Sequence, residues 1–222
     1  MKQQSRLPHS LSILFTLTQL YLVFFFLMSD ALNTTITQVS IVQASLVSYS
    51  STTSNLLLIV GIAAQAVGIG ATWLIQRRYK LHTFTLLRIN CVFIVLLTIW
   101  GMIGNWTPHF GFKTIVEPWL YQTAYGLFVC PWFAISQTAI SDVAPRGLEF
   151  QFFCLLNVSG KSASFIGPFV TSAISNRAGN SDSAPFYFLF ALATFSCIFL
   201  VPLDGKKARL EQARFLAQRK RV

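Results

Sequence analysis

The chain alternates between long apolar segments and short polar connections. An α-helix needs about 20 consecutive apolar residues to cross the hydrocarbon core of a bilayer. Six segments approach or exceed this length: residues 10–47, 56–75, 83–104, 118–140, 152–174 and 185–203. The pattern therefore predicts an all-α integral membrane protein, a bundle of six transmembrane helices with a short leading segment (1–9) and a basic trailing segment (204–222).

Polar residues interrupt the first apolar segment, namely Asp30, Asn33, Thr34 and Thr37. Two interpretations are open. The helix could end near residue 33 and leave a polar outer loop, or one long helix could continue to the end of the segment. No glycine or proline occurs between Met28 and Tyr49, which favours the continuous helix because these residues most often end helices. A continuous helix would place Asp30 at membrane depth.

The composition supports a membrane environment. Hydrophobic residues make up 54% of the chain and charged residues only 11%, whereas soluble domains carry about 25% charged residues. The net charge of +10 would suggest nucleic-acid binding in a soluble protein. Here the basic residues lie mostly at the ends of apolar segments and near the end of the chain, as the positive-inside rule describes. We therefore expect a lipid bilayer and no nucleic acid as partner, with both termini in the cytosol.

Ionisable side chains inside a membrane are costly, so each one needs an explanation. Asp30 shares a helix face with Asn33, Thr34 and Thr37, because these residues follow it at spacings of three, four and seven. The polar face predicts either a substrate- or proton-binding group in a water-filled cavity, or an acid at a helix end that faces lumenal water. Both interpretations stay open.

Two further spans carry candidate residues. Tyr121, Tyr125 and Trp132 lie on the fourth segment, where their polar aromatic side chains suit a cavity wall, although anchoring at the membrane interface explains Tyr121 equally well. Pro131 should kink this helix. Lys161 lies inside the fifth segment, and it could pair with Asp30, pair with a carboxylate elsewhere, or extend along the helix toward the interface.

Catalytic and metal-binding patterns are missing from the sequence. No Ser-His-Asp set, paired acids or His/Cys cluster occurs, and the four cysteines each lie within an apolar segment. We therefore expect no enzyme activity, no cofactor and no metal, and unpaired thiols. The sequence Asn105-Trp106-Thr107 matches a glycosylation sequon and falls at the non-cytosolic end of a span, which makes Asn105 a candidate glycan acceptor.

Two neighbouring stretches carry a resemblance to a known family. They are residues 142–153 (DVAPRGLEFQFF) and residues 160–168 (GKSASFIGP). Together they resemble the autophagy-related vacuole effluxer family of fungi, which belongs to the major facilitator superfamily. The resemblance implies the C-terminal half of a twelve-helix transporter, in which two halves rock around a site near the membrane midplane.

The resemblance also implies roles for the candidate residues. Asp30, Tyr121, Tyr125 and Trp132 would face a central cavity, Asp142, Arg146 and Glu149 would form a cytosolic charge clamp, and Lys161 would lie on a gating helix. The implied function is export of neutral amino acids such as leucine and tyrosine from the vacuole during autophagy. The implied partners are these amino acids and a second six-helix half or a second copy of the chain. The alternative is a truncated or non-transporting six-span protein that acts as a scaffold or partner subunit.

Overall fold

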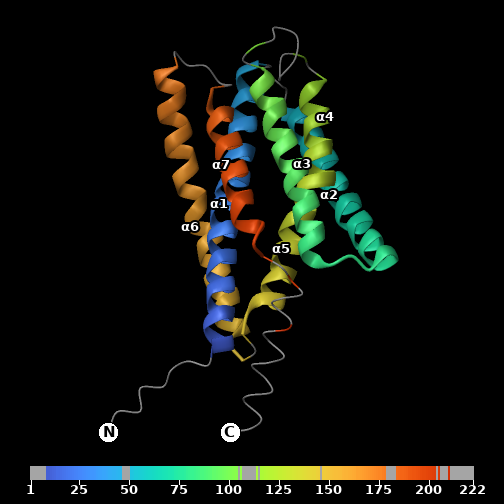
Figure 1. Cartoon of the computed structure of the whole chain (residues 1–222). Helices are drawn as coiled ribbons and strands as arrows, with labels where there is room; N and C mark the ends of the chain where they lie inside the picture. Colours follow the sequence, from blue (N-terminus) through green and yellow to red (C-terminus); the bar gives the residue numbers. More distant parts are fainter. Residues whose placement is uncertain are drawn as a thin grey trace.

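The computed structural model describes residues 9–46, 51–104, 116–145, 147–178 and 184–203, together with the isolated positions 106, 114, 205 and 210. Every regular element within these residues is helical (Figure 1). The elements are α1 (His9–Leu46), α2 (Ser51–Tyr79), α3 (Thr83–Ile103), α4 (Glu117–Ala124), the π-helix η1 (Tyr125–Val129), α5 (Cys130–Val143), α6 (Glu149–Arg177) and α7 (Pro185–Leu200). Arg146, Asn105, and most of the leading and trailing segments lie outside the described residues.

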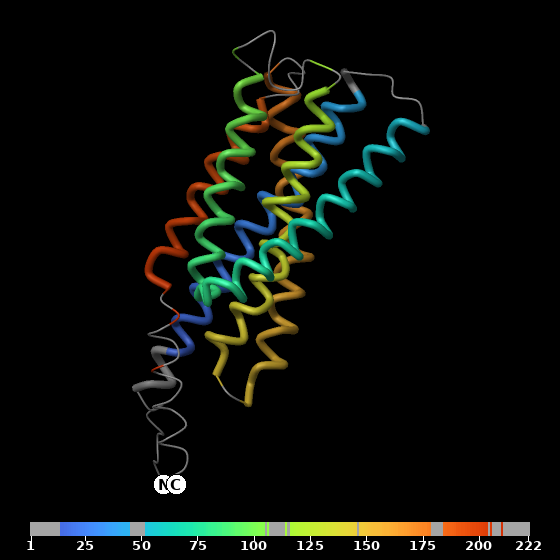
Figure 2. The backbone as a smooth tube through the Cα atoms, turned by 90° about the vertical axis from the view of Figure 1, so that its right-hand side faces the viewer, coloured from blue at the N-terminus to red at the C-terminus, as the bar shows by residue number. Residues whose placement is uncertain are grey.

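The helices form one bundle with α1 at its centre. Helix α1 packs against α6 and α7, helix α3 packs against α7 and α5, and helix α2 packs against α4 and η1. Helices α2 and α6 therefore lie at opposite edges of the bundle (Figure 1), and α2 is tilted relative to α3 (Figure 2).

Helix α1 continues without a break from His9 to Leu46, which is the longer of the two forms considered for this segment. Its polar side chains are accommodated by hydrogen bonds to the preceding turn. The hydroxyl of Thr35 donates to the Ala31 carbonyl over 2.7 Å, and that of Ser40 donates to the Ile36 carbonyl over 2.9 Å. Such bonds let Ser and Thr occupy a helix interior, so the polar stretch does not end the helix.

The fourth apolar segment contains a local change of helix type. Helix α4 passes into η1, which passes into α5, and Pro131 is the second residue of α5. Proline has no N–H to donate, and its ring collides with the carbonyl four residues earlier in a regular α-helix. The predicted irregularity at Pro131 therefore takes the form of a wider π-helical turn that precedes the proline.

Glycines on α2 let it approach η1 closely. A Cβ atom added to Gly68 would lie 2.6 Å from the Leu127 carbonyl oxygen, and one added to Gly126 would lie 2.8 Å from the Ala64 Cβ. Neither distance is compatible with a side chain, so the two helices touch backbone to backbone. The small-residue face of α2 thus has a packing role.

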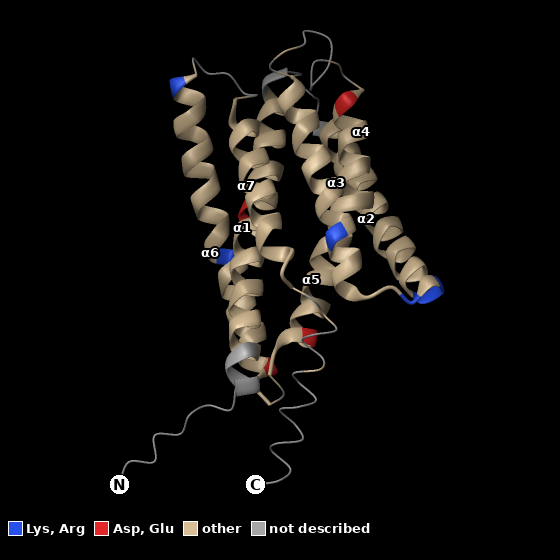
Figure 3. Ribbon diagram, in the orientation of Figure 1, with Lys and Arg blue, Asp and Glu red and all other residues tan. Residues whose placement is uncertain are grey.

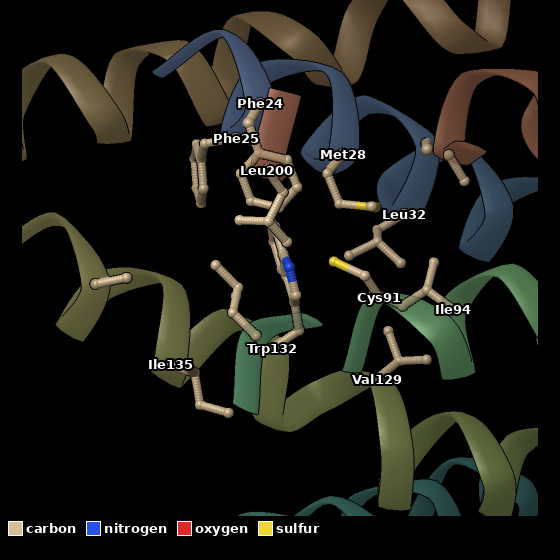
Figure 4. Packing of buried hydrophobic residues seen from close by; sticks show 14 of the residues in the cluster. Phe24, Phe25, Met28, Leu32, Cys91, Ile94, Val129, Trp132, Ile135 and Leu200 are labelled. Carbon is tan, nitrogen blue, oxygen red and sulfur yellow. The ribbon is translucent and has the colours of Figure 1, made fainter. Parts of the chain in front are cut away.

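Aromatic side chains fill the interior between α1 and α5. Phe25 stacks on Trp132 with ring centroids 5.4 Å apart, and Phe24 meets Trp132 at 6.2 Å (Figure 4). Trp132 is fully buried. It belongs to this packed core, which corrects the expectation that it faces a cavity, because phenyl rings occupy the space around its indole.

The helices differ in how well they meet the requirements for crossing a membrane. Within the described residues, three helical segments are both long and apolar enough: Leu14–Ala44, Thr52–Tyr79 and Thr83–Ile103. Helix α7 is apolar but shorter, α6 contains Lys161, and the α4–η1–α5 segment is divided by the π-helix. The count of six spans therefore stays a prediction.

Candidate functional site

A buried carboxylate joins α1 to α6. Asp30 is only 4% exposed, and its Oδ1 accepts a hydrogen bond from the Gly167 backbone N–H over 3.0 Å. The Thr34 hydroxyl donates to the same oxygen over 3.4 Å. We refer to this arrangement as the Asp30–Gly167 contact.

The sequence around Gly167 explains why the contact forms there. Pro168 follows within α6, and a proline weakens the helical hydrogen-bond ladder because it lacks an N–H and displaces a carbonyl. Gly167 also leaves room for α1, since a Cβ at this position would overlap the Thr34 hydroxyl and lie 2.8 Å from Asp30 Oδ1. The Asp30 carboxylate therefore stabilises α6 at its weakest turn.

The predicted polar face of α1 is divided in the structure. Asp30 and Thr34 are buried against α6, whereas Thr37 is exposed and donates to the Asn33 carbonyl. Asn33 is partly buried and donates to the Ser29 hydroxyl over 3.3 Å. Beyond Thr34 the buried face shifts toward Gln38 and Val42, which leaves Thr37 outside and corrects the expectation of one continuous polar stripe toward the interior.

A separate cavity of about 580 Å³ lies between α1, α2, α4 and η1. Its polar lining consists of amides, phenols and hydroxyls, including Gln43, Gln65, Gln122, Tyr121 and Tyr125, and its apolar lining includes Ile36, Val39, Leu57 and Leu58. No lysine, arginine, aspartate or glutamate is among the described residues that line it. We call it the Gln–Tyr cavity. Tyr121 and Tyr125 line the Gln–Tyr cavity, as predicted for a cavity wall. Asp30, which was expected to face the same cavity, does not line it.

Two polar atoms at the Gln–Tyr cavity have no hydrogen-bond partner in the described part of the chain. They are Nε2 of Gln43 and the hydroxyl of Tyr125, and both atoms are buried. Tyr125 is the first residue of η1, and its ring stacks on Tyr121 with centroids 6.3 Å apart. Buried polar groups are almost always paired in folded proteins, so these two atoms are suited to a bound polar solute. π-helical turns also occur frequently at functional sites.

The structure describes two of the three residues of the predicted charge clamp, Asp142 and Glu149. Oδ2 of Asp142 accepts a hydrogen bond from the Thr83 hydroxyl over 3.2 Å, and Oε2 of Glu149 accepts one from the Gly147 N–H over 2.7 Å. Gly147 has a φ of 94°, a conformation that glycine adopts without strain. Arg146 lies outside the described residues, so the pairing of the clamp is untested.

Lys161 belongs neither to the charge clamp nor to an ion pair with Asp30. It lies well inside α6, and its side chain is exposed, whereas Asp30 accepts its hydrogen bonds from Gly167 and Thr34. Of the three alternatives for Lys161, pairing with Asp30 does not occur among the described residues, and the other two stay open. Asp30 is buried between α1 and α6, whereas the Lys161 side chain lies on the exposed side of α6.

Other polar contacts were not predicted. The Tyr21 hydroxyl donates to the Ser136 carbonyl over 2.6 Å, and the Thr18 hydroxyl lies 3.2 Å from the Val143 carbonyl, so both residues tie α1 to α5. Arg88 of α3 donates to the carbonyls of Val201 and Leu203 over 3.1 and 2.9 Å, just beyond α7. The glutamines of the Gln–Tyr cavity were missed as well, although an uncharged amide within an apolar segment is a usable signal.

Interrupted helices beside a polar cavity, within an otherwise apolar bundle, are characteristic of membrane transporters. The π-helical turn η1 beside the Gln–Tyr cavity gives this chain both features. The chain belongs to the family described as vacuole effluxer, Atg22-like, whose profile matches residues 10–213. This match confirms the resemblance carried by residues 142–153 and 160–168.

Individual relatives agree with the family assignment. Autophagy-related protein 22 of Saccharomyces cerevisiae is 27% identical over 195 residues, which cover 86% of this chain and 36% of the relative. The protein of the same name from Kluyveromyces lactis is 28% identical over 195 residues, covering 86% and 39%. That from Cryptococcus neoformans is 27% identical over 198 residues, covering 85% and 33%. The chain thus spans between 33% and 39% of the length of these relatives, and no solved structure matches it.

Proposed function

We propose that this chain forms part of a vacuolar membrane transporter that exports neutral amino acids, such as leucine and tyrosine, during autophagy. The observation that carries the proposal is the Gln–Tyr cavity with its two unpaired buried groups, Gln43 Nε2 and the Tyr125 hydroxyl. The family assignment supports the vacuolar location.

The chemistry of the cavity suits a small solute with a polar backbone and an uncharged side chain. Amides and phenols both donate and accept hydrogen bonds, and they can bind the amine or carboxylate of an amino acid. The apolar wall formed by Val39, Leu57 and Leu58 would contact its side chain. The volume of about 580 Å³ lies within the range of about 300–1,000 Å³ found for small-molecule sites.

The Asp30–Gly167 contact supplies a movable element for such a transporter. Transport of this kind requires helices to change their mutual positions around the site. Since one carboxylate oxygen holds α6 to α1 beside Pro168, we propose that α6 bends at this point, and that binding or release of a proton by Asp30 accompanies the movement.

The proposed export can be measured on isolated vacuoles. Vacuoles that contain this chain should release radiolabelled leucine or tyrosine faster than vacuoles from matched cells that lack it. Immunoblotting of the vacuolar membrane serves as the control for the presence of the protein. Equal release with the protein in the membrane would refute the proposed export and support the alternative of a non-transporting scaffold.

A further inference from the structure

The predicted span formed by α6 would place Lys161 at an unusual depth for a charged side chain. Helix α6 runs from Glu149 to Arg177. At a rise of about 1.5 Å per residue, Lys161 lies about 18 Å along the axis from the first of these residues and about 24 Å from the second. Since the hydrocarbon core of a bilayer is about 30 Å thick, Lys161 lies well inside it when α6 spans the membrane.

The charge of Lys161 is not neutralised within the described part of the chain. No carboxylate there forms an ion pair with it: Asp30 contacts Gly167 and Thr34, and Glu149 lies at the start of α6. A lysine at this depth normally pairs with an opposite charge or faces a water-filled cavity. The ammonium group is therefore available to an anionic partner from outside the described residues.

The surroundings of Lys161 indicate what this partner is. The side chain lies on a shallow, widely open recess of about 460 Å³ on one face of α6, lined by Asn157, Val158, Ser162 and Phe165 as well as Lys161 itself. We call it the Lys161 recess. The recess offers one cation, an amide and a hydroxyl beside exposed apolar side chains, and Phe165 is 69% exposed. This set of groups suits a small molecule with a single carboxylate and an apolar group. A phosphate dianion would leave one negative charge without a counter-charge in this recess.

We propose that Lys161 binds the α-carboxylate of the transported amino acid and thereby determines specificity for free amino acids over uncharged analogues. This inference deepens the proposed function and rests on it for the identity of the solute. The Lys161 recess and the Gln–Tyr cavity share no lining residue: the recess lies on α6, and the cavity lies between α1, α2, α4 and η1. The inference therefore gives the carboxylate a binding place separate from the Gln–Tyr cavity.

The test is equilibrium binding of radiolabelled leucine to the purified full chain in lipid nanodiscs. Leucinamide, which lacks the carboxylate charge, serves as a competitor. Hydrogen bonds to charged groups imply that leucinamide binds the wild type about 10- to 100-fold more weakly than leucine. Lys161→Gln should weaken leucine binding by a similar factor and abolish the preference for leucine over leucinamide. Lys161→Arg should retain most of the affinity, and Arg177→Gln, which removes a charge at the end of α6, should bind as the wild type does.

Three results would overturn the inference: no leucine binding by the wild type, equal binding of leucine and leucinamide by the wild type, or unchanged leucine binding by Lys161→Gln. The melting temperature of each variant, measured in the same nanodiscs, separates lost binding from lost folding. Vacuolar efflux distinguishes this inference from the proposed function. Carboxylate-selective binding without efflux would refute export alone, whereas efflux without carboxylate selectivity would refute the role of Lys161 alone.

Discussion

At the scale of single residues, Asp30 combines two properties that substitution can separate. Its Oδ1 accepts the Gly167 N–H, which requires only an acceptor oxygen at that place. Its carboxylate can also gain or lose a proton, which requires an acid. A residue that only fastens α1 to α6 would need the first property alone.

The substitution Asp30→Asn keeps an acceptor oxygen but removes the titratable acid, so we expect near wild-type stability and reduced leucine efflux. Asp30→Ala removes the acceptor as well and should lower stability by about 1–3 kcal/mol, the cost of leaving a buried donor unpaired. Melting temperature and efflux are measured for both variants. Full efflux by Asp30→Asn would exclude a proton-binding role.

Tyr125 offers a second test at the residue scale, because its buried hydroxyl has no partner among the described residues. Tyr125→Phe removes a polar group that costs free energy when it is unpaired, so the melting temperature should stay the same or rise. If the hydroxyl binds the solute, the half-saturating leucine concentration for efflux should rise about 5- to 10-fold, which corresponds to one hydrogen bond of about 1 kcal/mol. An unchanged half-saturating concentration would remove Tyr125 from the binding site.

At the scale of helices, the backbone contact between α2 and η1 shapes the Gln–Tyr cavity. Gly68 meets the Leu127 carbonyl, whereas a Cβ at Gly70 of the same helix would meet nothing within 4 Å. The two glycines are two residues apart on α2, so Gly70 can serve as a matched control for Gly68. Only one of them is required for close approach.

Gly68→Ala should push α2 away from η1 and destabilise the protein by about 1–3 kcal/mol, as overpacking does. Gly70→Ala should be neutral or stabilising by up to about 1 kcal/mol, because alanine favours a helix more than glycine does. Thermal unfolding in nanodiscs checks both values. Similar melting temperatures for the two variants would contradict the close contact.

The sequence predicted some elements and missed others for identifiable reasons. The unbroken α1 followed from the absence of glycine and proline between Met28 and Tyr49. The form of the irregularity at Pro131 did not follow, because a proline can be accommodated by a kink or by a π-turn. The partner of Lys161 stayed open, because spacing along one helix does not reveal which face meets a neighbour.

At the scale of the whole molecule, the charge distribution indicates how the bundle is oriented. Charged side chains gather mostly at the helix ends (Figure 3). The end that contains Asp142 also contains Arg77 and Arg78 in the last turn of α2, since the Thr83 hydroxyl at the start of α3 donates to Asp142. By the positive-inside rule, we propose that this end faces the cytosol.

Two introduced cysteines test the orientation. Tyr79 is 70% exposed beside the basic end, and Val116 is 62% exposed at the opposite end of the bundle. In intact vacuoles, a membrane-impermeant maleimide should label Tyr79→Cys and should label Val116→Cys only after lysis. The unmodified chain, which contains exposed Cys154 on α6, provides the background. The reverse labelling pattern would show that the proposed orientation is wrong.

Hydrogen exchange at the Asp30–Gly167 contact can report whether α1 and α6 separate. The Gly167 amide is protected by a carboxylate from another helix, so its exchange with deuterium requires α1 and α6 to separate at that point. If transport involves bending beside Pro168, this amide should exchange faster while substrate is being turned over than in the resting protein. The exchange rate of the Gly167 amide proton would then report how often α6 separates from α1.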